Sequence, residues 1–246
     1  MRPFLQCLAF LSLTLGIQAA RDPMRLTHGP MLGNPTSDSV RVWGRTSDPG
    51  EFSVRYGTVE GKLDQVSEPT TTRISNDNTG YAILQNLKPD QTYHYQIHIK
   101  DRPHGLPGSF LTLPSAEYTR NAEHNPKGLF NFRFQIGSCA NQNPVHGNGH
   151  RAKTYENLNR DWAQKTNFHI MNGDWLYEEL REYPVEAWRL RAGIDALPPV
   201  VNLMPTVVGV WENYKLYLSR GISLSQWHRN VPSYFTFDDH ELVNDI

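Results

Sequence analysis

The periodicity of apolar residues changes near residue 115, and this change limits the folds that the chain can adopt. Residues 26–114 contain short runs in which apolar and polar residues alternate, such as 39–43 and 92–99, with Gly, Pro, Asp or Asn between them. Such alternation is typical of strands with one buried face. After residue 130, apolar strand candidates and helical spacings follow one another, as at 154–163 and 207–218. We therefore predict an α+β chain of two domains.

The first domain, residues 26–114, is predicted to be a β-sandwich. The Leu87–Asp90 segment has the composition of a turn and leads into the alternating run 92–99. This pair resembles the corner of a fibronectin type III or related immunoglobulin-like sandwich, in which a tyrosine hydroxyl bonds to upstream backbone. Tyr93 has the position for that role. Polar residues 115–130 are predicted to be a linker, and a sandwich alone indicates no function.

In residues 131–246, each of three apolar strand candidates is followed by polar residues of metal-binding type. The strand candidates are 132–136, 168–171 and 234–237. The segments that follow them are Gly137-Ser138-Cys139, Asn172-Gly173-Asp174-x-x-Tyr177-Glu178 and Asp238-Asp239-His240-Glu241. Ligands bind beyond the carboxyl ends of strands in an open parallel α/β sheet. We therefore expect these segments to meet in space.

The residue types predict a site for two cations. Carboxylates, imidazole, thiolate and phenolate together exceed what a structural site needs, and paired cations lie about 3.5–4 Å apart. Asp174 is the natural bridging ligand, because its strand falls between the other two in sequence. Tyr177 binds as phenolate only to a strong Lewis acid, since its pKa in water is about 10. With Cys139 it favours trivalent iron, whereas oxygen ligands suit Ca²⁺ or Mg²⁺.

These motifs, in this order after a sandwich and an export signal, resemble the PhoD-like alkaline phosphatase family of metallophosphoesterases. The resemblance covers nearly the whole chain after residue 20. It implies a secreted hydrolase of phosphate monoesters and diesters (an EC 3.1 type) that uses Fe³⁺ and Ca²⁺. The implied metal ligands are Cys139, Asp174, Tyr177, Asp238, Asp239 and Asn244.

The resemblance also implies a role for each position. Cys139, Asp174 and Tyr177 would hold the iron. Asp239, with or without Asp238, and the more distant Asn244 would belong to the second metal or the phosphate pocket. The implied catalytic residues are Asp239 and His240, and the histidine would stabilise the phosphate or protonate the leaving group.

The family's catalytic domain continues past the Asp-Asp-His-Glu segment and supplies further His and Asp ligands. The resemblance therefore predicts that residues 131–246 form only the first half of a metallophosphoesterase domain. We expect an incomplete ligand set and a last strand with an exposed edge.

The amino-terminal residues 1–20 predict a secretory signal peptide. Arg2 precedes an apolar run, Phe4–Ile17, and small residues follow at Ala19 and Ala20. We therefore expect a secreted or periplasmic protein, with an uncleaved anchor as the alternative. No later segment approaches the ~20 apolar residues of a membrane span. Once residues 1–20 are removed, Cys139 is the only cysteine, so no internal disulfide is possible.

The expected partners are small phosphate esters. A formal net charge of −1 and a pI of about 6.8 argue against a general nucleic-acid surface. The substrate, the preference for monoesters or diesters, and the oligomeric state stay open.

Two other functions compete with the phosphatase hypothesis. The first is a cysteine hydrolase in which Cys139 works with His240 or His169, although it leaves Asp174 and Tyr177 unexplained. The second is a secreted binding module in which the sandwich recognises a partner and the incomplete second domain is inert.

Overall fold

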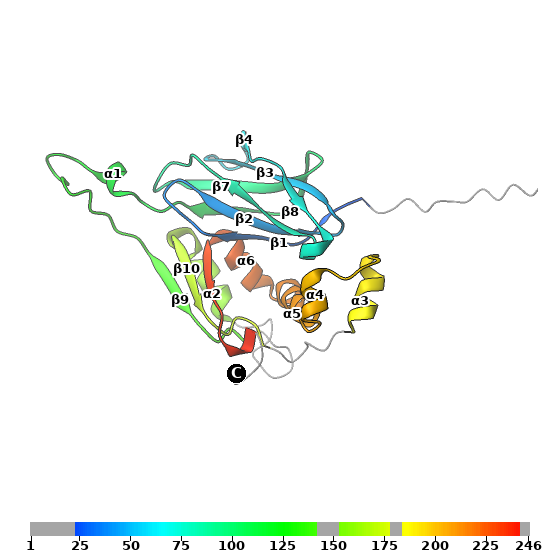
Figure 1. Cartoon of the computed structure of the whole chain (residues 1–246). Coiled ribbons are helices and arrows are strands. Elements are labelled where there is room, and N and C mark those ends of the chain that lie inside the picture. The colour runs from blue at the N-terminus through cyan, green and yellow to red at the C-terminus, as the bar shows by residue number, and fades with distance from the viewer. Residues whose placement is uncertain (1–22, 142–152, 178–183, 242–246) are drawn as a thin grey trace, which may run out of the picture.

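Two β-sheets organise the computed structural model, which describes residues 23–141, 153–177 and 184–241 (Figure 1). One sheet has six strands in the order β6-β2-β1-β11-β10-β9, and the other has the order β4-β3-β7-β8, with β5 paired to β3. The strands are β1 Leu26–Gly33, β2 Val40–Thr46, β3 Gly50–Gly57, β4 Gln65–Val66, β5 Thr70–Thr72, β6 Thr79–Leu84, β7 Thr92–Ile99, β8 Arg102–Leu111, β9 Phe134–Gly137, β10 Phe168–Asn172 and β11 Ser233–Thr236.

Most of the helices follow the first eight strands in the chain. The α-helices are α1 Ala116–Thr119, α2 Lys153–Asp161, α3 Val185–Ala192, α4 Pro199–Leu203, α5 Val207–Arg220 and α6 Ile222–Asn230. The short 3₁₀ helices are η1 Ile74–Asn76, η3 Ala163–Lys165 and η4 Asp239–Glu241. Within the described residues, no helix is both long enough and apolar enough to cross a membrane.

The alternating runs of the first part form the predicted β-sandwich. In β2, Val40 and Val42 are buried while Arg41 between them is exposed. In β3, Phe52 and Val54 are likewise buried, and Ser53 between them is only partly buried. Because successive side chains of a strand point to opposite faces, this alternation places one face of each sheet in a shared apolar core. The predicted fold class, a β-sandwich followed by a partial α/β region, is confirmed.

Tyr93 forms the predicted corner of the sandwich. Its side chain is 3% exposed, and its hydroxyl accepts a hydrogen bond of 2.9 Å from the backbone N–H of Lys88. Its ring stacks on Phe110 of β8, with the centroids 5.8 Å apart. The hydroxyl therefore fixes the turn that precedes β7 against the sandwich core.

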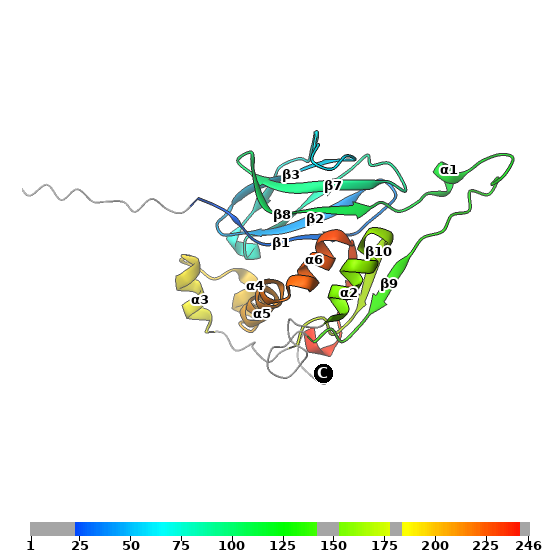
Figure 2. The same ribbon diagram turned by 180° about the vertical axis from the view of Figure 1, so that it is seen from behind.

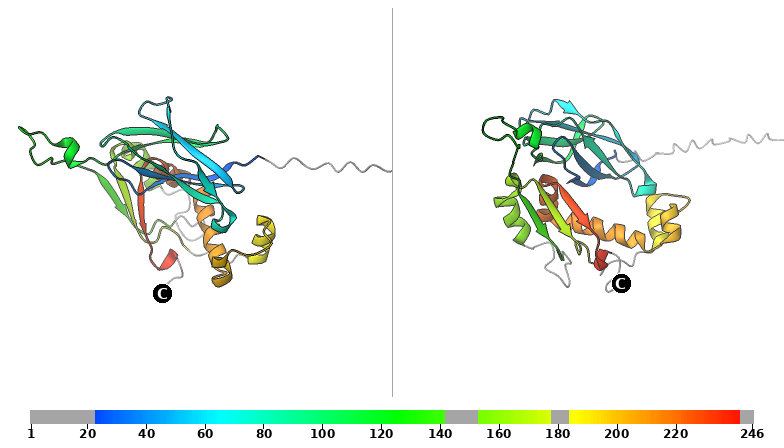
Figure 3. Two further views of the ribbon diagram at one scale, coloured as in Figure 1. Left: turned by 45° about the horizontal axis from the view of Figure 1, so that its top comes forward. Right: turned by 60° about the vertical axis from the view of Figure 1, so that its left-hand side comes forward.

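Strands β9, β10 and β11 are parallel, as the positions of their polar segments require. Ile170 of β10 lies beside Ile136 of β9 and Tyr234 of β11. Figure 3 (right) shows the three arrows pointing the same way, so their carboxyl ends share one edge. β9 begins two residues later than predicted, at Phe134.

The six-stranded sheet continues from the sandwich into the α/β part. β1 pairs in parallel with β11 through Gly33 and Ser233. Helix α6 lies against β1 and β8 (Figure 2). At this contact the Tyr95 hydroxyl donates a hydrogen bond of 2.7 Å to the carbonyl of Arg229. The two predicted domains are therefore joined by sheet pairing and by packing as well as by chain connectivity.

One face of the β9–β10–β11 sheet carries stacked aromatic rings. Phe134 and Phe168 lie 5.4 Å apart, and Phe168 meets the edge of Tyr234 at 5.8 Å. The opposite face packs on α2 and α6, where His169 contacts Trp227. The last strand was predicted to have an exposed edge, but β11 lies between β1 and β10 in the six-stranded sheet, because Ser233 pairs with Gly33 of β1. Among the described residues, β9 is the edge strand at this end of the sheet.

Two local predictions differ from the structure. The helix expected from Thr154 begins at Lys153 and ends at Asp161, and Trp162 is 47% exposed instead of contributing to the buried face. The segment predicted as a linker, 115–130, contains α1, whose first turn is capped by the Ser115 hydroxyl. The chain between β8 and β9 runs away from the rest of the molecule (Figure 1).

We predict that Tyr93→Phe lowers the free energy of unfolding by about 1 kcal/mol, because the Lys88 N–H loses its acceptor. Urea denaturation measures the change. Tyr118→Phe is the matched control, since Tyr118 is 62% exposed, and it should leave stability unchanged. Equal effects of the two substitutions would contradict the assignment of the corner.

Candidate metal centre

The candidate site lies where β9 and β10 end. Cys139 and Asp174, which follow these two strands, both have left-handed backbone, with φ of 53° and 54°. The N–H of Cys139 donates to the carbonyl of Gly173 at 3.3 Å, and the N–H of Ala140 donates to the carbonyl of Asp174 at 2.8 Å. Left-handed backbone is costly for residues other than glycine and is concentrated at functional sites. The two strand ends are thus tied together in a strained conformation.

Asp174 is the residue at which the predicted ligands meet. Its Oδ2 accepts from the Cys139 thiol at 3.3 Å and from the Tyr177 hydroxyl at 3.4 Å. Ligand atoms of Asp174, Asp239 and His240 all lie within 4.8 Å of one another. Three segments that are far apart in the sequence therefore converge on one carboxylate.

The second oxygen of Asp174 supports a cation at this point. Oδ1 is buried and has no hydrogen-bond partner among the described residues. A buried polar atom without a partner costs free energy, and a bound cation would satisfy it. The surrounding thiol, phenol, carboxylate and imidazole are all metal-binding groups. The residues of the site therefore fit a metal ion.

The local charges act on Tyr177. Burial, followed by the negative charge of Asp174 and the neighbouring Cys139, raises the pKa of the Tyr177 hydroxyl above its ordinary value. The phenol thus stays protonated unless a positive charge is present. Its ring also stacks on His240, with centroids 4.1 Å apart. This contact holds the imidazole beside the carboxylate cluster.

Glu241 joins the third segment to the second. Its carboxylate is 3% exposed and accepts backbone N–H bonds from Asp174, Trp175 and Leu176, at 3.0, 2.6 and 3.1 Å. It also accepts the N–H of Asp238 at 2.8 Å. Four donors on one buried carboxylate fix the loop after β10 against η4. Glu241 ends the Asp-Asp-His-Glu motif, but the motif by itself does not indicate this anchoring role.

The two aspartates of that motif occupy different positions. Asp238 is exposed, its Oδ1 accepts the N–H of Asp239 at 3.0 Å, and it lies outside the cluster of Asp174, Asp239 and His240. A side chain at Gly173, whose φ is 81°, would come within 2.5 Å of the Asp238 Cβ. Asp239 is therefore the better placed ligand of the pair, and Asp238 packs against the glycine turn.

Beneath the site, Trp175 connects to the helical layer. Its Nε1–H donates to His228 Nε2 at 3.1 Å, and His228 Nδ1 lies 2.8 Å from Ser233 Oγ. The Ser233 hydroxyl donates to the carbonyl of Val231 at 3.0 Å, so Nδ1 is the protonated nitrogen. Burial lowers the pKa of His228 well below its ordinary value, which keeps the ring neutral. Trp175 is thus a core residue whose polar atom is satisfied.

Helix α5 supports the loop from the other side. The side-chain amide of Asn213, a buried residue, donates to the backbone carbonyl of Tyr177. Sequence reasoning did not identify Asn213, because a single asparagine within a helical pattern gives no signal of its partner. Asn244 and the signal segment 1–20 lie outside the described residues, so their predicted roles stay predictions.

Comparison with known proteins gives two family matches. The family described as "PhoD-like phosphatase, N-terminal domain" matches residues 12–114, and the family described as "PhoD-like phosphatase" matches residues 134–246. A search of curated proteins found no match.

The fold is shared with a solved structure described as "Structure of PhoD". It superposes with a TM-score of 0.63 at 20% identity, over 87% of this chain and 39% of that chain. This chain thus spans about two fifths of the length of the PhoD structure. The sensor domain of the anti-sigma factor RsgI4 of Pseudobacteroides cellulosolvens has a TM-score of 0.31 at 17% identity, over 39% of this chain and 100% of that chain.

We predict that Glu241→Ala destabilises the protein by about 3 kcal/mol, because four backbone donors lose a buried acceptor. Thermal denaturation measures the loss. Glu241→Gln should be milder, since one carbonyl oxygen remains. The exposed Glu60→Ala variant is the control and should be neutral. Wild-type stability in Glu241→Ala would refute the anchoring role.

Protonation of His169 should destabilise the fold in acid. Burial lowers the pKa of His169 from 6.5 to about 4, and within the part of the chain that the structure describes neither ring nitrogen has a hydrogen-bond partner. The unfolded chain therefore binds a proton below pH 6.5 that the folded chain does not bind until about pH 4. The contribution of neutral His169 to the free energy of unfolding is therefore fully present above pH 6.5. It is lost as the pH falls towards 4, at up to about 1.4 kcal/mol per pH unit.

Urea denaturation at several pH values tests this prediction. His169→Phe should reduce the loss of stability between about pH 6.5 and pH 4, whereas the contributions of the buried His28 and His228 remain. His124→Phe, at a side chain that is 76% exposed, should keep the wild-type slope. The same slope in all three proteins would show that His169 does not carry the effect.

Proposed function

This chain belongs to the PhoD-like phosphatase family, and on that premise we propose that it is a metal-dependent hydrolase of phosphate esters. The observation that carries the proposal is the convergence of Cys139, Asp174 and Tyr177 with Asp239 and His240. The buried Oδ1 of Asp174, which has no partner in residues 23–141, 153–177 and 184–241, supports a cation at the centre of this group.

Two kinds of ligand surround Asp174 in this proposal. Cys139 and Tyr177 would complete an Fe³⁺ site, because thiolate and phenolate favour a trivalent iron. Asp239 would take part in a second site for Ca²⁺, which prefers oxygen ligands. Asp174, which contacts both groups, would be shared between them. Asp238 and Asn244 stay candidate oxygen donors of the second site.

When bound, the cations would supply the Lewis acidity that activates water and offsets charge on the phosphate. The protein's own contribution is to hold the ligands in place before substrate arrives. The Glu241 carboxylate fixes the backbone of Asp174 by accepting the Asp174 N–H. The side-chain amide of Asn213, on α5, fixes Tyr177 by donating to its backbone carbonyl. Positioned groups of this kind avoid reorganisation during the reaction.

His240 is our candidate for the proton donor to the leaving group. Its ring stacks on Tyr177, and one of its nitrogens lies within 4.8 Å of the ligand atoms of Asp174 and Asp239. A histidine beside such a centre can protonate a departing alkoxide if the oxygen comes within hydrogen-bond distance. Asp239 would assist through its charge.

The cysteine hydrolase is a weaker alternative. The Cys139 thiol donates to the carboxylate of Asp174, and no described residue hydrogen-bonds to the ring nitrogens of His169. His169 therefore does not serve as a base for Cys139 in this arrangement. A non-catalytic binding module is the second alternative, and it predicts a folded protein without metal.

We further propose that the protein is secreted or periplasmic, after removal of residues 1–20. Its substrates would be small phosphate esters. The near-neutral net charge of −1 supports a protein without a general nucleic-acid surface.

Metal analysis of the purified chain tests the proposal. We expect about one iron per chain, with calcium, and a lower iron content in Cys139→Ala and Asp174→Asn. The Asp161→Asn variant, at an exposed carboxylate of α2, is the control and should keep the metal. Mass spectrometry quantifies the metals, and hydrolysis of p-nitrophenyl phosphate and its diester reports the activity.

The outcomes separate the hypotheses. Metal-dependent hydrolysis that is lost in Asp174→Asn supports the phosphoesterase. Iron binding without hydrolysis would support the metal site but contradict the proposal that this chain is an active phosphoesterase. A folded protein with no metal would favour the binding module, and loss of activity only on thiol alkylation would favour the cysteine hydrolase.

A further inference from the structure

The outer face of the sandwich sheet carries a row of apolar side chains. Neighbouring residues of β1, β2 and β6 that point into the sandwich core are Leu32, Val42 and Ala82. The next row across the same three strands consists of Met31, Trp43 and Tyr81, and it therefore points to the opposite face. The outer face of an antiparallel sheet is ordinarily polar. The packing of the sandwich core thus gives no reason for this apolar row.

Helix α5 carries a second apolar surface. Trp211, Tyr214 and Leu218 are spaced by three and four residues, so they lie along one side of the helix. Other aromatic side chains fix two of these rings. The centroids of Trp211 and Trp188 lie 5.8 Å apart, and Tyr214 stacks on Trp175 at 5.4 Å.

The sandwich row and the α5 surface enclose an open pocket of about 760 Å³, which both of them line. Among the described residues, no ring contact joins Trp43 or Tyr81 to Trp211 or Tyr214. Two apolar walls therefore face each other without packing together. Sites for small molecules have volumes of about 300–1,000 Å³ and are lined mainly by apolar and aromatic side chains.

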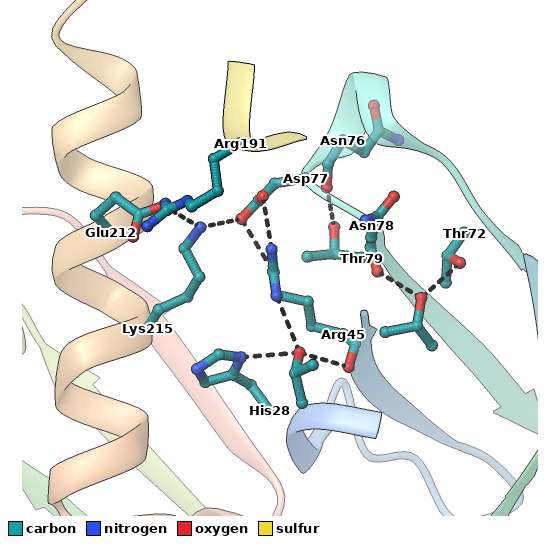
Figure 4. A network of polar contacts seen from close by, with 12 residues as sticks. His28, Arg45, Thr72, Asn76, Asp77, Asn78, Thr79, Arg191, Glu212 and Lys215 are labelled. Atoms are coloured by element: carbon teal, nitrogen blue, oxygen red, sulfur yellow. Dashed lines mark hydrogen bonds and ion pairs between the residues drawn. The ribbon is translucent and has the colours of Figure 1, made fainter. Parts of the chain in front are cut away.

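An ionic bridge connects the two walls of this pocket (Figure 4). The Lys215 ammonium of α5 lies 3.0 Å from the carboxylate of Asp77, which follows η1 of the sandwich. The Arg45 guanidinium of β2 donates to both oxygens of that carboxylate, at 2.9 and 3.1 Å. The side chains of Asp77 and Lys215 are only 7 and 13% exposed. The bridge thus holds α5 at a fixed distance from the sandwich, and the pocket exists before any ligand enters.

The lining fits an uncharged ligand with flat rings. Asp77 pairs with both Arg45 and Lys215, so these three lining charges are satisfied within the protein. The other charged residue of the described lining is Arg41, an exposed side chain whose guanidinium lies 4.7 Å from the Tyr81 ring centroid. Aromatic rings pack favourably on other rings in offset or edge-to-face arrangements. We propose that this pocket binds a flat, uncharged aromatic small molecule.

The proposed pocket is separate from the candidate metal centre. None of Asp174, Asp239 and His240 is among its lining residues. The inference therefore goes beyond the proposed phosphoesterase activity and does not depend on it.

Calorimetric titration of the full chain with 2-naphthol tests the proposal. This probe is uncharged at neutral pH, and decahydro-2-naphthol has the same carbon skeleton without flat aromatic rings. We expect saturable binding of 2-naphthol. The saturated analogue should bind about fivefold more weakly or worse, because it cannot stack on the rings of the two walls.

Two substitutions in the lining should weaken the binding of 2-naphthol. Tyr81→Ala removes one ring of the sandwich wall, and we expect about fivefold weaker binding. Val200→Lys, on α4, places a charge at the apolar lining, and we expect a loss of about fivefold or more. The side chains of Tyr81 and Val200 are 47 and 40% exposed, so the fold should persist, as circular dichroism can verify.

Matched control variants make the test specific. Tyr118→Ala and Val66→Lys replace exposed residues outside the lining, and both should bind 2-naphthol like the wild type. Asp174→Asn should also keep the binding, whether or not the phosphoesterase activity exists. Absence of saturable binding, equal binding of the saturated analogue, or equal weakening by the control variants would overturn the proposal. Loss of binding in Asp174→Asn alone would assign the aromatic molecule to the metal centre instead.

Discussion

The buried carboxylate of Glu241 is the interaction on which the candidate site depends. It accepts four backbone N–H groups, three from the loop after β10 and one from Asp238 at the start of the last segment. A buried charge is tolerated only when it is satisfied in this way. The same bonds fix the positions of Asp174 and Asp239. Glu241 accepts the N–H of Asp174 itself and the N–H of Asp238, the residue before Asp239. A site built from strand ends thus has its geometry set by a residue that need not touch a ligand.

Strand β11 connects the segment that contains Glu241 to the rest of the structure. That strand is parallel to β10 on one side and meets β1 of the sandwich through Gly33 and Ser233 on the other. Helix α6 fills the angle between sandwich and sheet, where Tyr95 bonds to Arg229. The sandwich therefore packs against the elements that carry the site, although its own residues lie outside the metal cluster. The ion pair of Asp77 with Lys215 also links the sandwich to helix α5.

Much of the fold could be predicted from the residues alone. Alternation in 92–99 predicted β7, and the Leu-x-Pro turn before it predicted the bond of Tyr93. Such features are local, because the period of the side chains and the turn chemistry act within a few residues. The predicted end of α2 was wrong, because the helix stops at Asp161, before Trp162. The Trp162 ring contacts the cations of Arg133 and Lys165 and stays exposed. The family membership rests on motif order, which is also a property of the sequence.

The sequence by itself determined which residue types could form the site and which strands would deliver them. Only the tertiary structure decided that Asp239, and not Asp238, joins Asp174 and His240. Adjacent residues cannot be distinguished by pattern, because the choice depends on the packing of Asp238 against Gly173, which lies far away in the sequence. The roles of Glu241 and Asn213, and the ion pair of Asp77 with Lys215, likewise required the fold. Each depends on contacts between residues far apart in the chain, and no local period or propensity records such contacts.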